Sequence, residues 1–247
     1  MLISLILSIQ LLYNAFVNKA NPAIEESDPY FNSYVLHFYN NLEDTNLNYK
    51  AFYFALKGYF NLIAEQKLHN DSVLTIIDYT KSANIPRFYM IDMYEKKLIN
   101  KTFVSHGKNS GTEFARYFSN EFNSFKSAIG FFITSETYYG KHGYSLRMEG
   151  IENEINHNAR NRDIVIHGAE YVNDFFIKKQ GYIGRSHGCP ALPKEMCGNI
   201  IERIKECSCI FAYYQDQNYL KKSRVINSNS YLIYFEENNK IMPEKKP

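Results

Sequence analysis

Tryptophan is missing from this 247-residue sequence, and acidic and basic side chains nearly balance. A net charge of +2, without a basic stripe of interleaved aromatic residues, excludes the pattern of a nucleic-acid-binding surface. The 45% share of apolar residues excludes wholesale disorder. What remains is a chain long enough for one globular domain of ordinary size and an extension.

The first eighteen residues have no charged side chain. Residues 1–17 (MLISLILSIQLLYNAFV) are mostly apolar, and the first charge is Lys19. This run is shorter than the roughly 20 residues of a membrane helix and is typical of a secretory signal. The basic residues that usually begin a signal peptide are missing, and Ala20 makes a mediocre cleavage site. We expect residues 1–20 to be a signal peptide that exports the protein to the periplasm or cell envelope. Membrane association through an uncleaved N-terminal anchor ranks second, and a buried helix third.

Cysteine is scarce, and all four cysteines lie in the last third of the chain: Cys189, Cys197, Cys207 and Cys209. Their spacing does not form the paired C-x-x-C units of a zinc site, so we expect no metal. Cys207 and Cys209 are too close in an extended strand to pair with each other, because alternate residues rise about 6.6 Å. A disulfide from Cys197 to either of them stays open. We expect Cys189 to be reduced.

Hydrophobic spacing divides the remaining chain into helical and strand-rich parts. Residues 21–70 contain a short helical pattern at 34–42 and a stronger one at 52–63, which Asn48 is placed to cap. Residues 71–215 predict an α+β domain dominated by sheet, with one late amphipathic helix at 195–206. The strands are expected at 73–77, 87–93, 98–104, 129–134, 164–166 and 209–214. Residues 216–247 are expected to form a polar tail, with one optional strand at 231–235.

The segment 181–193 (GYIGRSHGCPALP) concentrates features that a core strand does not need. A cysteine directly after a glycine in such a loop can present its sulfur while neighbouring amides converge as an oxyanion hole. A thiol with an ordinary pKa of about 8.5 needs a nearby base. His167 at the end of a predicted strand and His187 beside Cys189 are the candidates. We favour His167, because partners that are distant in sequence are usual for nucleophilic cysteines.

The other histidines are interpreted as structural residues: His37, His69, His106, His142 and His157. A lone cysteine or histidine is more often structural than catalytic. The combination of IVIHGA and GRSHGC instead favours a catalytic role for the histidine and cysteine in these two segments.

These two segments resemble the L,D-transpeptidase (YkuD-like) family, in its murein L,D-transpeptidase catalytic domain branch. The family carries His-Gly after a strand and then a Ser-x-Gly-Cys loop, which stand here as His167-Gly168 and as residues 186–189. The resemblance covers about residues 71–214, through segments such as RFYMIDM, YYGKHGYSLRMEG and NARNRDIVIHGA.

The resemblance implies a β-rich catalytic domain, sandwich- or barrel-like, that needs no cofactor and acts on peptidoglycan stem peptides. Cys189 would attack the carbonyl between the third and fourth stem residues, and the thioester would pass to an amine or to water. His167 would be the base, oriented by the carbonyl of Gly168, and amides near Gly188 and Cys189 would hold the oxyanion. Further residues are expected at the substrate: Ser186, His187, Arg185, Tyr138 and Asn120.

Some of these roles stay open. Arg185 suits a carboxylate clamp by its chemistry but is nearly as compatible with a surface arginine. Asn120 and Tyr138 could equally brace the fold. Many family members have arginine two residues after the cysteine, where this chain has Ala191, and its interval from His167 to Cys189 is longer. The alternatives are an L,D-carboxypeptidase using the same site, a silent wall-binding module, and a metal-binding protein.

Overall fold

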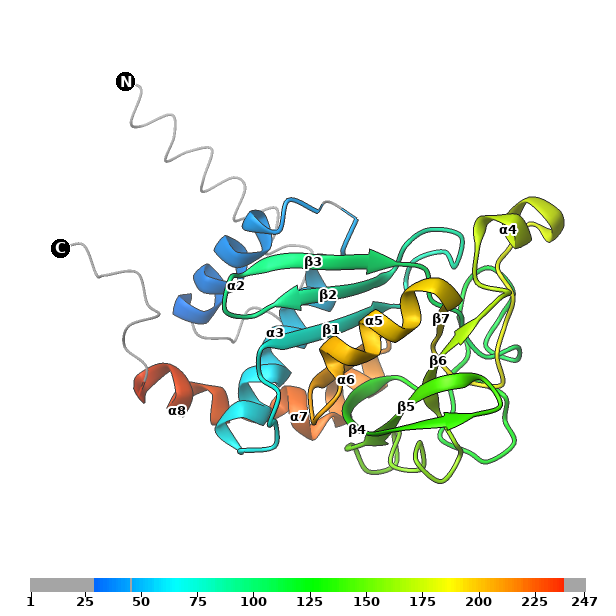
Figure 1. Ribbon diagram of the computed structural model, residues 1–247. Coiled ribbons are helices and arrows are strands. Elements are labelled where there is room, and N and C mark those ends of the chain that lie inside the picture. The colour runs from blue at the N-terminus through cyan, green and yellow to red at the C-terminus, as the bar shows by residue number, and fades with distance from the viewer. Residues whose placement is uncertain (1–28, 45, 238–247) are drawn as a thin grey trace, which may run out of the picture. The chain divides into compact units, whose positions relative to one another are not determined.

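The computed structural model describes residues 29–44 and 46–237 (Figure 1). The chain divides into two compact units, residues 1–38 and 39–247. Helix α2 (Pro29–Asn41) begins in the first unit and includes most of the predicted pattern at 34–42. The predicted signal peptide lies outside the described residues. Within the described ranges, no helix is long and apolar enough to cross a membrane.

Helix α3 (Tyr49–Ala64) confirms the stronger helical prediction. Asn48 caps it as expected, since its side chain accepts hydrogen bonds from the backbone N–H groups of Lys50 at 2.9 Å and Ala51 at 3.4 Å. The helix packs closely on the sheet at Gly58, where an added Cβ would lie 2.0 Å from the ring of Phe131. Only glycine therefore allows this approach.

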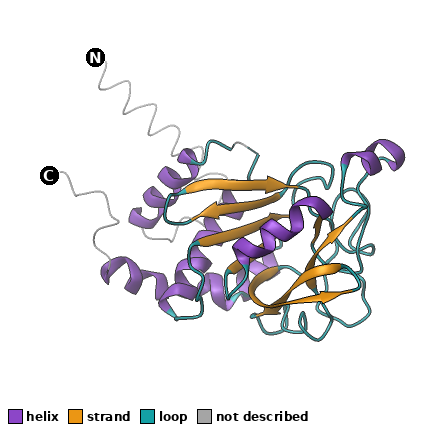
Figure 2. Ribbon diagram, viewed as in Figure 1, coloured by secondary structure: helices purple, strands orange, loops and turns teal. Residues whose placement is uncertain are grey.

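The core of the second unit is one eight-stranded mixed sheet, whose strands are orange in Figure 2. The strand order is β3-β2-β1-β8-β4-β5-β6-β7. The β1–β8 and β6–β7 pairs are parallel, and the other pairs are antiparallel. The sheet and its helices confirm the predicted α+β class. The strands are β1 (Val73–Asp78), β2 (Phe88–Asp92), β3 (Lys97–Thr102), β4 (Gly130–Gly140), β5 (Gly143–Gly150), β6 (Val165–Ala169), β7 (Ala191–Pro193) and β8 (Cys209–Tyr213).

Strand β8 lies in the middle of the sheet although it comes last in sequence. All five of its residues are buried, and the ring of Phe211 stacks on that of Phe131 with centroids 4.2 Å apart. Helix α5 (Lys194–Ile204) directly follows β7 and matches the predicted late helix. It buries Cys197, Ile200, Ile201 and Ile204 on one side. The strand–helix unit β7–α5 thus fixes the end of the loop that carries Cys189.

The predicted strand at residues 231–235 is wrong. In the part of the chain that the structure describes, β8 is followed by helices α6 (Gln217–Lys222), α7 (Arg224–Asn227) and α8 (Ser230–Glu237). Tyr231 and Phe235, one helical turn apart, are both buried. The segment YLIYF is apolar throughout, so periodicity alone could not separate a strand from a helix.

A buried carboxylate anchors these C-terminal helices. Glu152 accepts hydrogen bonds from the backbone N–H of Phe131 at 2.7 Å, from the hydroxyl of Tyr219 at 3.0 Å and from the hydroxyl of Ser223. These donors compensate the cost of removing the carboxylate from water.

The sequence prediction also missed strands β5 and β7 and helix α4 (Asp174–Gln180).

Candidate active site

A cavity of about 660 Å³ opens beside the strand ends of β6 and β7. It brings together most of the side chains that the sequence singled out: Cys189, His167, Ser186, His187, Arg185 and Tyr138. Asn120 is not among its lining residues. The residues come from the β4–β5 hairpin, β6 and the loop before β7. Their proximity therefore depends on the register in which these strands pair.

The register of β6 and β7 places His167 on β6 close to the loop that carries Cys189 into β7. His167 pairs with Ala191 in the parallel ladder, and Cys189 lies two residues before Ala191. His167 also pairs with Ser145 on the other side of β6. The imidazole is therefore held on a strand with neighbours on both sides, while Cys189 stands where the loop enters β7.

His167 is buried and has the tautomer that a base requires. Its Nδ1 lies 3.0 Å from the carbonyl oxygen of Gly168, so Nδ1 carries the proton and Nε2 keeps its lone pair. Burial lowers the pKa of His167, the Gly168 carbonyl raises it, and the nearby His142 and Lys141 lower it further, with a net decrease. The ring is therefore neutral at pH 7. The contact with Gly168 is the one the resemblance implied; the catalytic role of the pair remains a prediction.

Cys189 is a free thiol, partly exposed in the cavity wall. Its Sγ lies 3.4 Å from the backbone oxygen of Asp163, within reach of a weak hydrogen bond. Burial raises its pKa, the backbone N–H of Val165 and the charges of Lys141 and Arg162 lower it, and Asp163 raises it, with a net increase. The resting residue is therefore a thiol, and it needs a base to become a nucleophile. The other three cysteines are also free.

The loop before Cys189 is held by Ser186 and Gly188. The Ser186 hydroxyl donates to the Cys189 carbonyl at 2.7 Å and accepts from the Gly188 N–H at 3.0 Å. Gly188 has φ of +130°, and an added Cβ would lie 2.8 Å from the backbone oxygen of Lys126. The Gly188 N–H is thus already used as a donor to Ser186. Among the described residues no acceptor binds the Cys189 amide, so its N–H can donate to a bound group.

The other predicted substrate residues have different partners. Arg185 donates to the carbonyls of Lys108 at 3.2 Å and Gly111 at 3.0 Å, so it braces a loop while lining the cavity. The ring of His187 lies 4.6 Å from that of Phe125.

Tyr138 and Asn120 come from segments of the branch that we expected near the cleft. The Tyr138 ring lies under the guanidinium of Arg147, 4.5 Å from ring centroid to Cζ, and faces the cavity. The Asn120 side chain accepts from the Asn158 N–H at 3.0 Å and contacts His157, which makes it a brace for that loop.

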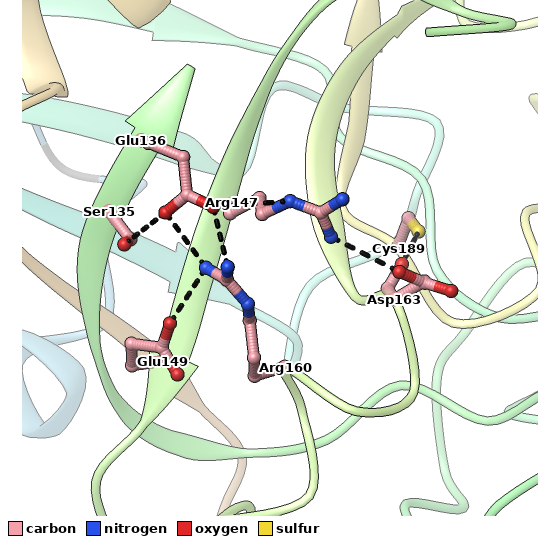
Figure 3. Close-up of polar contacts among 7 residues, drawn as sticks. All are labelled: Ser135, Glu136, Arg147, Glu149, Arg160, Asp163 and Cys189. Atoms are coloured by element: carbon pink, nitrogen blue, oxygen red, sulfur yellow. Dashed lines mark hydrogen bonds and ion pairs between the residues drawn. The ribbon is translucent and has the colours of Figure 1, made fainter. Parts of the chain in front are cut away.

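An ion-pair network that the sequence did not reveal ends beside Cys189 (Figure 3). Arg160 pairs with Glu136 and Glu149, and Arg147 pairs with Glu136 at 3.4 Å and with Asp163 at 3.1 Å. The backbone oxygen of Asp163 faces the sulfur. These charges come from β4, β5 and the turn before β6, so their proximity depends on strand pairing and is not readable from spacing.

His142 also belongs to the cavity, in contrast to its structural interpretation from the sequence. Its ring stacks on that of His167 with centroids 4.2 Å apart and an angle of 22° between the planes. It lies at the tip of the β4–β5 hairpin. Of the histidines taken as structural, His106 fits that interpretation: it is buried, 2.8 Å from the guanidinium of Arg87.

The charge of the cavity is positive. Lys141, Arg147, Arg162 and Arg185 line it, and among its described lining residues only Asp163 is acidic. Asp163 is itself paired with Arg147. The cavity therefore favours an anionic ligand. Within the described ranges, no group of three His, Cys, Asp or Glu residues could hold a metal ion.

Comparison with known proteins identifies one family. A family model described as L,D-transpeptidase catalytic domain matches residues 43–213. Its match begins well before residue 71 and so includes α3. No curated protein matches the chain.

Solved structures of L,D-transpeptidases are similar to part of this chain at low identity. An L,D-transpeptidase from Mycobacterium smegmatis is 15% identical, with 58% of this chain and 59% of that chain covered and a TM-score of 0.37. An L,D-transpeptidase (residues 123–326) from Xylanimonas cellulosilytica is 14% identical, with 57% and 60% covered and a TM-score of 0.35. L,D-transpeptidase 1 from Mycobacterium tuberculosis is 11% identical, with 58% and 62% covered and a TM-score of 0.33. The chain thus spans under two thirds of the length of these structures.

Proposed function

The chain belongs to the L,D-transpeptidase catalytic domain family through its match over residues 43–213, and we propose that it transfers peptidoglycan stem peptides by way of a thioester at Cys189. The observation that carries the proposal is the common cavity of Cys189 and His167. In it the imidazole is neutral, its Nδ1 is tied to Gly168, and its Nε2 is left to accept a proton.

In the acylation half, the Cys189 thiol gives its proton to Nε2 of His167 and its sulfur attacks the carbonyl of the third stem residue. The Cys189 N–H donates to the oxyanion that forms. The bond to the fourth residue, a D-amino acid, then breaks, and its amine leaves with the proton from His167. The result is a thioester and a neutral imidazole.

In the second half, the amine of another stem attacks the thioester and loses a proton to His167. The C–S bond breaks, and the sulfur recovers the proton as a thiol. Water in place of the amine would give carboxypeptidase activity from the same intermediate. Because the stem peptide lies in the cell wall, we also propose that the protein acts in the cell envelope.

Intact-protein mass spectrometry with a disaccharide-tetrapeptide tests the proposal. We expect the mass of the protein to rise by that of the donor minus its terminal D-amino acid. The adduct should be absent in Cys189→Ala and slow to form in His167→Ala. Cys207→Ala is the matched control, since Cys207 is also a partly exposed free thiol but lies outside the cavity.

The products separate the alternatives. A cross-linked dimer on addition of an acceptor stem identifies a transpeptidase, and a free tripeptide identifies a carboxypeptidase. A folded protein that gives neither adduct nor product would contradict the proposal and leave a silent wall-binding module.

A further inference from the structure

The tip of the β4–β5 hairpin reaches the candidate base. Gly140, the last residue of β4, pairs with Gly143, the first residue of β5, so Lys141 and His142 form a two-residue turn between them. Both turn residues are exposed in general but also line the cavity. The ring of His142 stacks on the ring of His167.

The hairpin behind this tip is fixed at several points. The Tyr144 hydroxyl lies 2.5 Å from Glu202 of α5, and Arg147 pairs with Asp163. β5 itself is paired with β6 from Ser145 to Arg147, with Ser145 opposite His167. The position of His142 over His167 is therefore set by the same strand register that builds the cavity.

The stack restricts the tilt of the His167 ring, which the hydrogen bond to Gly168 alone leaves free. That bond holds Nδ1 of His167, but a single contact at one edge allows the ring to tilt about it. A second ring 4.2 Å away, at 22° to its plane, covers one face and opposes the tilt. It also keeps water from that face. Nε2 is thereby held in the direction that the thiol proton must take.

We propose that His142 is a positioning residue for the base, acting through the stacking of its ring on His167. The inference rests on the proposed function, because it assigns to the hairpin tip the task of aiming Nε2 during acylation. It predicts that an aromatic ring without ionisable nitrogen can replace His142, and that a side chain without a ring cannot.

Other charged groups act on His167 as well. The ionisable lining residues of the cavity are Tyr138, Lys141, His142, Arg147, Arg162, Asp163, Tyr171, Arg185, His187 and Cys189. After burial, the charge of Lys141 and that of His142 in its protonated form lower the pKa of His167. Burial and Lys141 in turn lower the pKa of His142, so its ring carries charge only in acid. A ring that cannot be protonated in place of His142 removes that repulsion and should therefore raise the pKa of His167.

The test compares His142→Ala with His142→Phe, and uses His69→Ala as the matched control. His69 is an exposed histidine that does not line the cavity. The rate of acylation by the tetrapeptide is measured against pH, and ¹⁵N NMR reports the tautomer and pKa of His167. We expect His142→Ala to slow acylation about tenfold at unchanged KM, and the Nδ1-protonated form of His167 to become less dominant. In His142→Phe the rate should stay within about threefold of the original, with the His167 pKa raised.

Two results would overturn the positioning role. Equal rates and unchanged NMR signals in all variants would show that the stack does nothing. Equal loss in the Ala and Phe variants would show that the imidazole of His142 acts chemically and not by stacking. If the original protein forms no adduct at all, the proposed function fails, and the NMR of His167 still decides whether the stack orients its ring.

Discussion

The guanidinium of Arg147 lies 3.1 Å from the carboxylate of Asp163, whose backbone oxygen in turn faces the sulfur of Cys189 (Figure 3). Asp163 has φ of +53°, a conformation that a non-glycine residue seldom adopts. The pair thus holds an unfavourable turn at the edge of the cavity. Because the Asp163 side chain is mostly exposed, the pair itself adds little to global stability.

We predict that Arg147→Gln lowers the rate of acylation more than it lowers stability. Loss of the pair frees the turn before β6 and so moves the wall against which the thiol lies. The expected loss is about tenfold in rate, with less than about 1 kcal/mol of unfolding free energy. Acylation kinetics and urea unfolding measure the two quantities. A large loss of stability at an unchanged rate would show that Arg147 only holds the fold.

Gly188→Ala should damage both the fold and the site. The position has φ of +130°, and the new Cβ would meet the backbone oxygen of Lys126 at 2.8 Å. We expect a loss of about 2 kcal/mol in unfolding free energy and a strongly reduced thiol reactivity. The matched control is Gly198→Ala in α5, where nothing lies within 4 Å of the new Cβ. That change should stabilise the protein by about 0.5–1 kcal/mol. Equal effects of the two substitutions would contradict the strain at Gly188.

The sequence predicted the elements with a strong local period. α3 with its Asn48 cap, the β2–β3 hairpin and α5 follow from spacing and from capping chemistry. β5 (GYSLRMEG) was missed, because Arg147 and Glu149 weaken its alternation. These residues pair with ions on β4 and in the turn before β6. Residues 231–235 are apolar throughout, so they carry no period that distinguishes a helix.

The site was predicted to the extent that it depends on short motifs. Residue type, spacing and resemblance singled out Cys189, His167 and the loop around Gly188 as candidates, and Cys189 and His167 line one cavity. His142 and Arg147 were not, since they approach the cavity only through the pairing of β5 with β6. Contacts of this kind depend on register between strands, which a single sequence does not specify.

The pH dependence of the acylation rate should be that of a neutral thiol at Cys189 beside a neutral imidazole at His167. The pKa of His167 is lowered from 6.5 and that of Cys189 is raised from 9.0. His167 is therefore deprotonated, and able to act as a base, from below pH 6.5 upward, while Cys189 stays a thiol until above pH 9. We expect the rate of acylation to rise with pH only below 6.5 and to be level through neutral pH. In His167→Ala it should increase about tenfold per pH unit up to pH 9, because only the thiolate then reacts. A level profile in the variant would contradict the role of His167 as base.

Buried Arg87 and His106 should control the stability of the protein in acid. Arg87 donates to the carbonyls of Val104 at 3.0 Å and Lys81 at 2.9 Å, and it lies 2.8 Å from Nδ1 of His106. Burial, followed by the charge of Arg87, lowers the pKa of His106 from 6.5 to about 3. The unfolded chain therefore binds a proton that the folded protein does not, so stability is lost as the pH falls from 6.5 toward 3.

We predict that His106→Gln makes unfolding less dependent on pH in that range, because the amide oxygen can still accept from Arg87 and no proton is taken up. The unfolding free energy measured by urea at pH 7 and at pH 4.5 gives the comparison, with His69→Gln as the control at an exposed histidine. Arg87→Met should cost about 3 kcal/mol at pH 7, since it leaves the buried carbonyl of Val104 and the part-buried carbonyl of Lys81 without their donor. If the pH dependence of His106→Gln equals that of the original protein, another group is responsible for acid sensitivity and the neutral state of His106 contributes nothing to it.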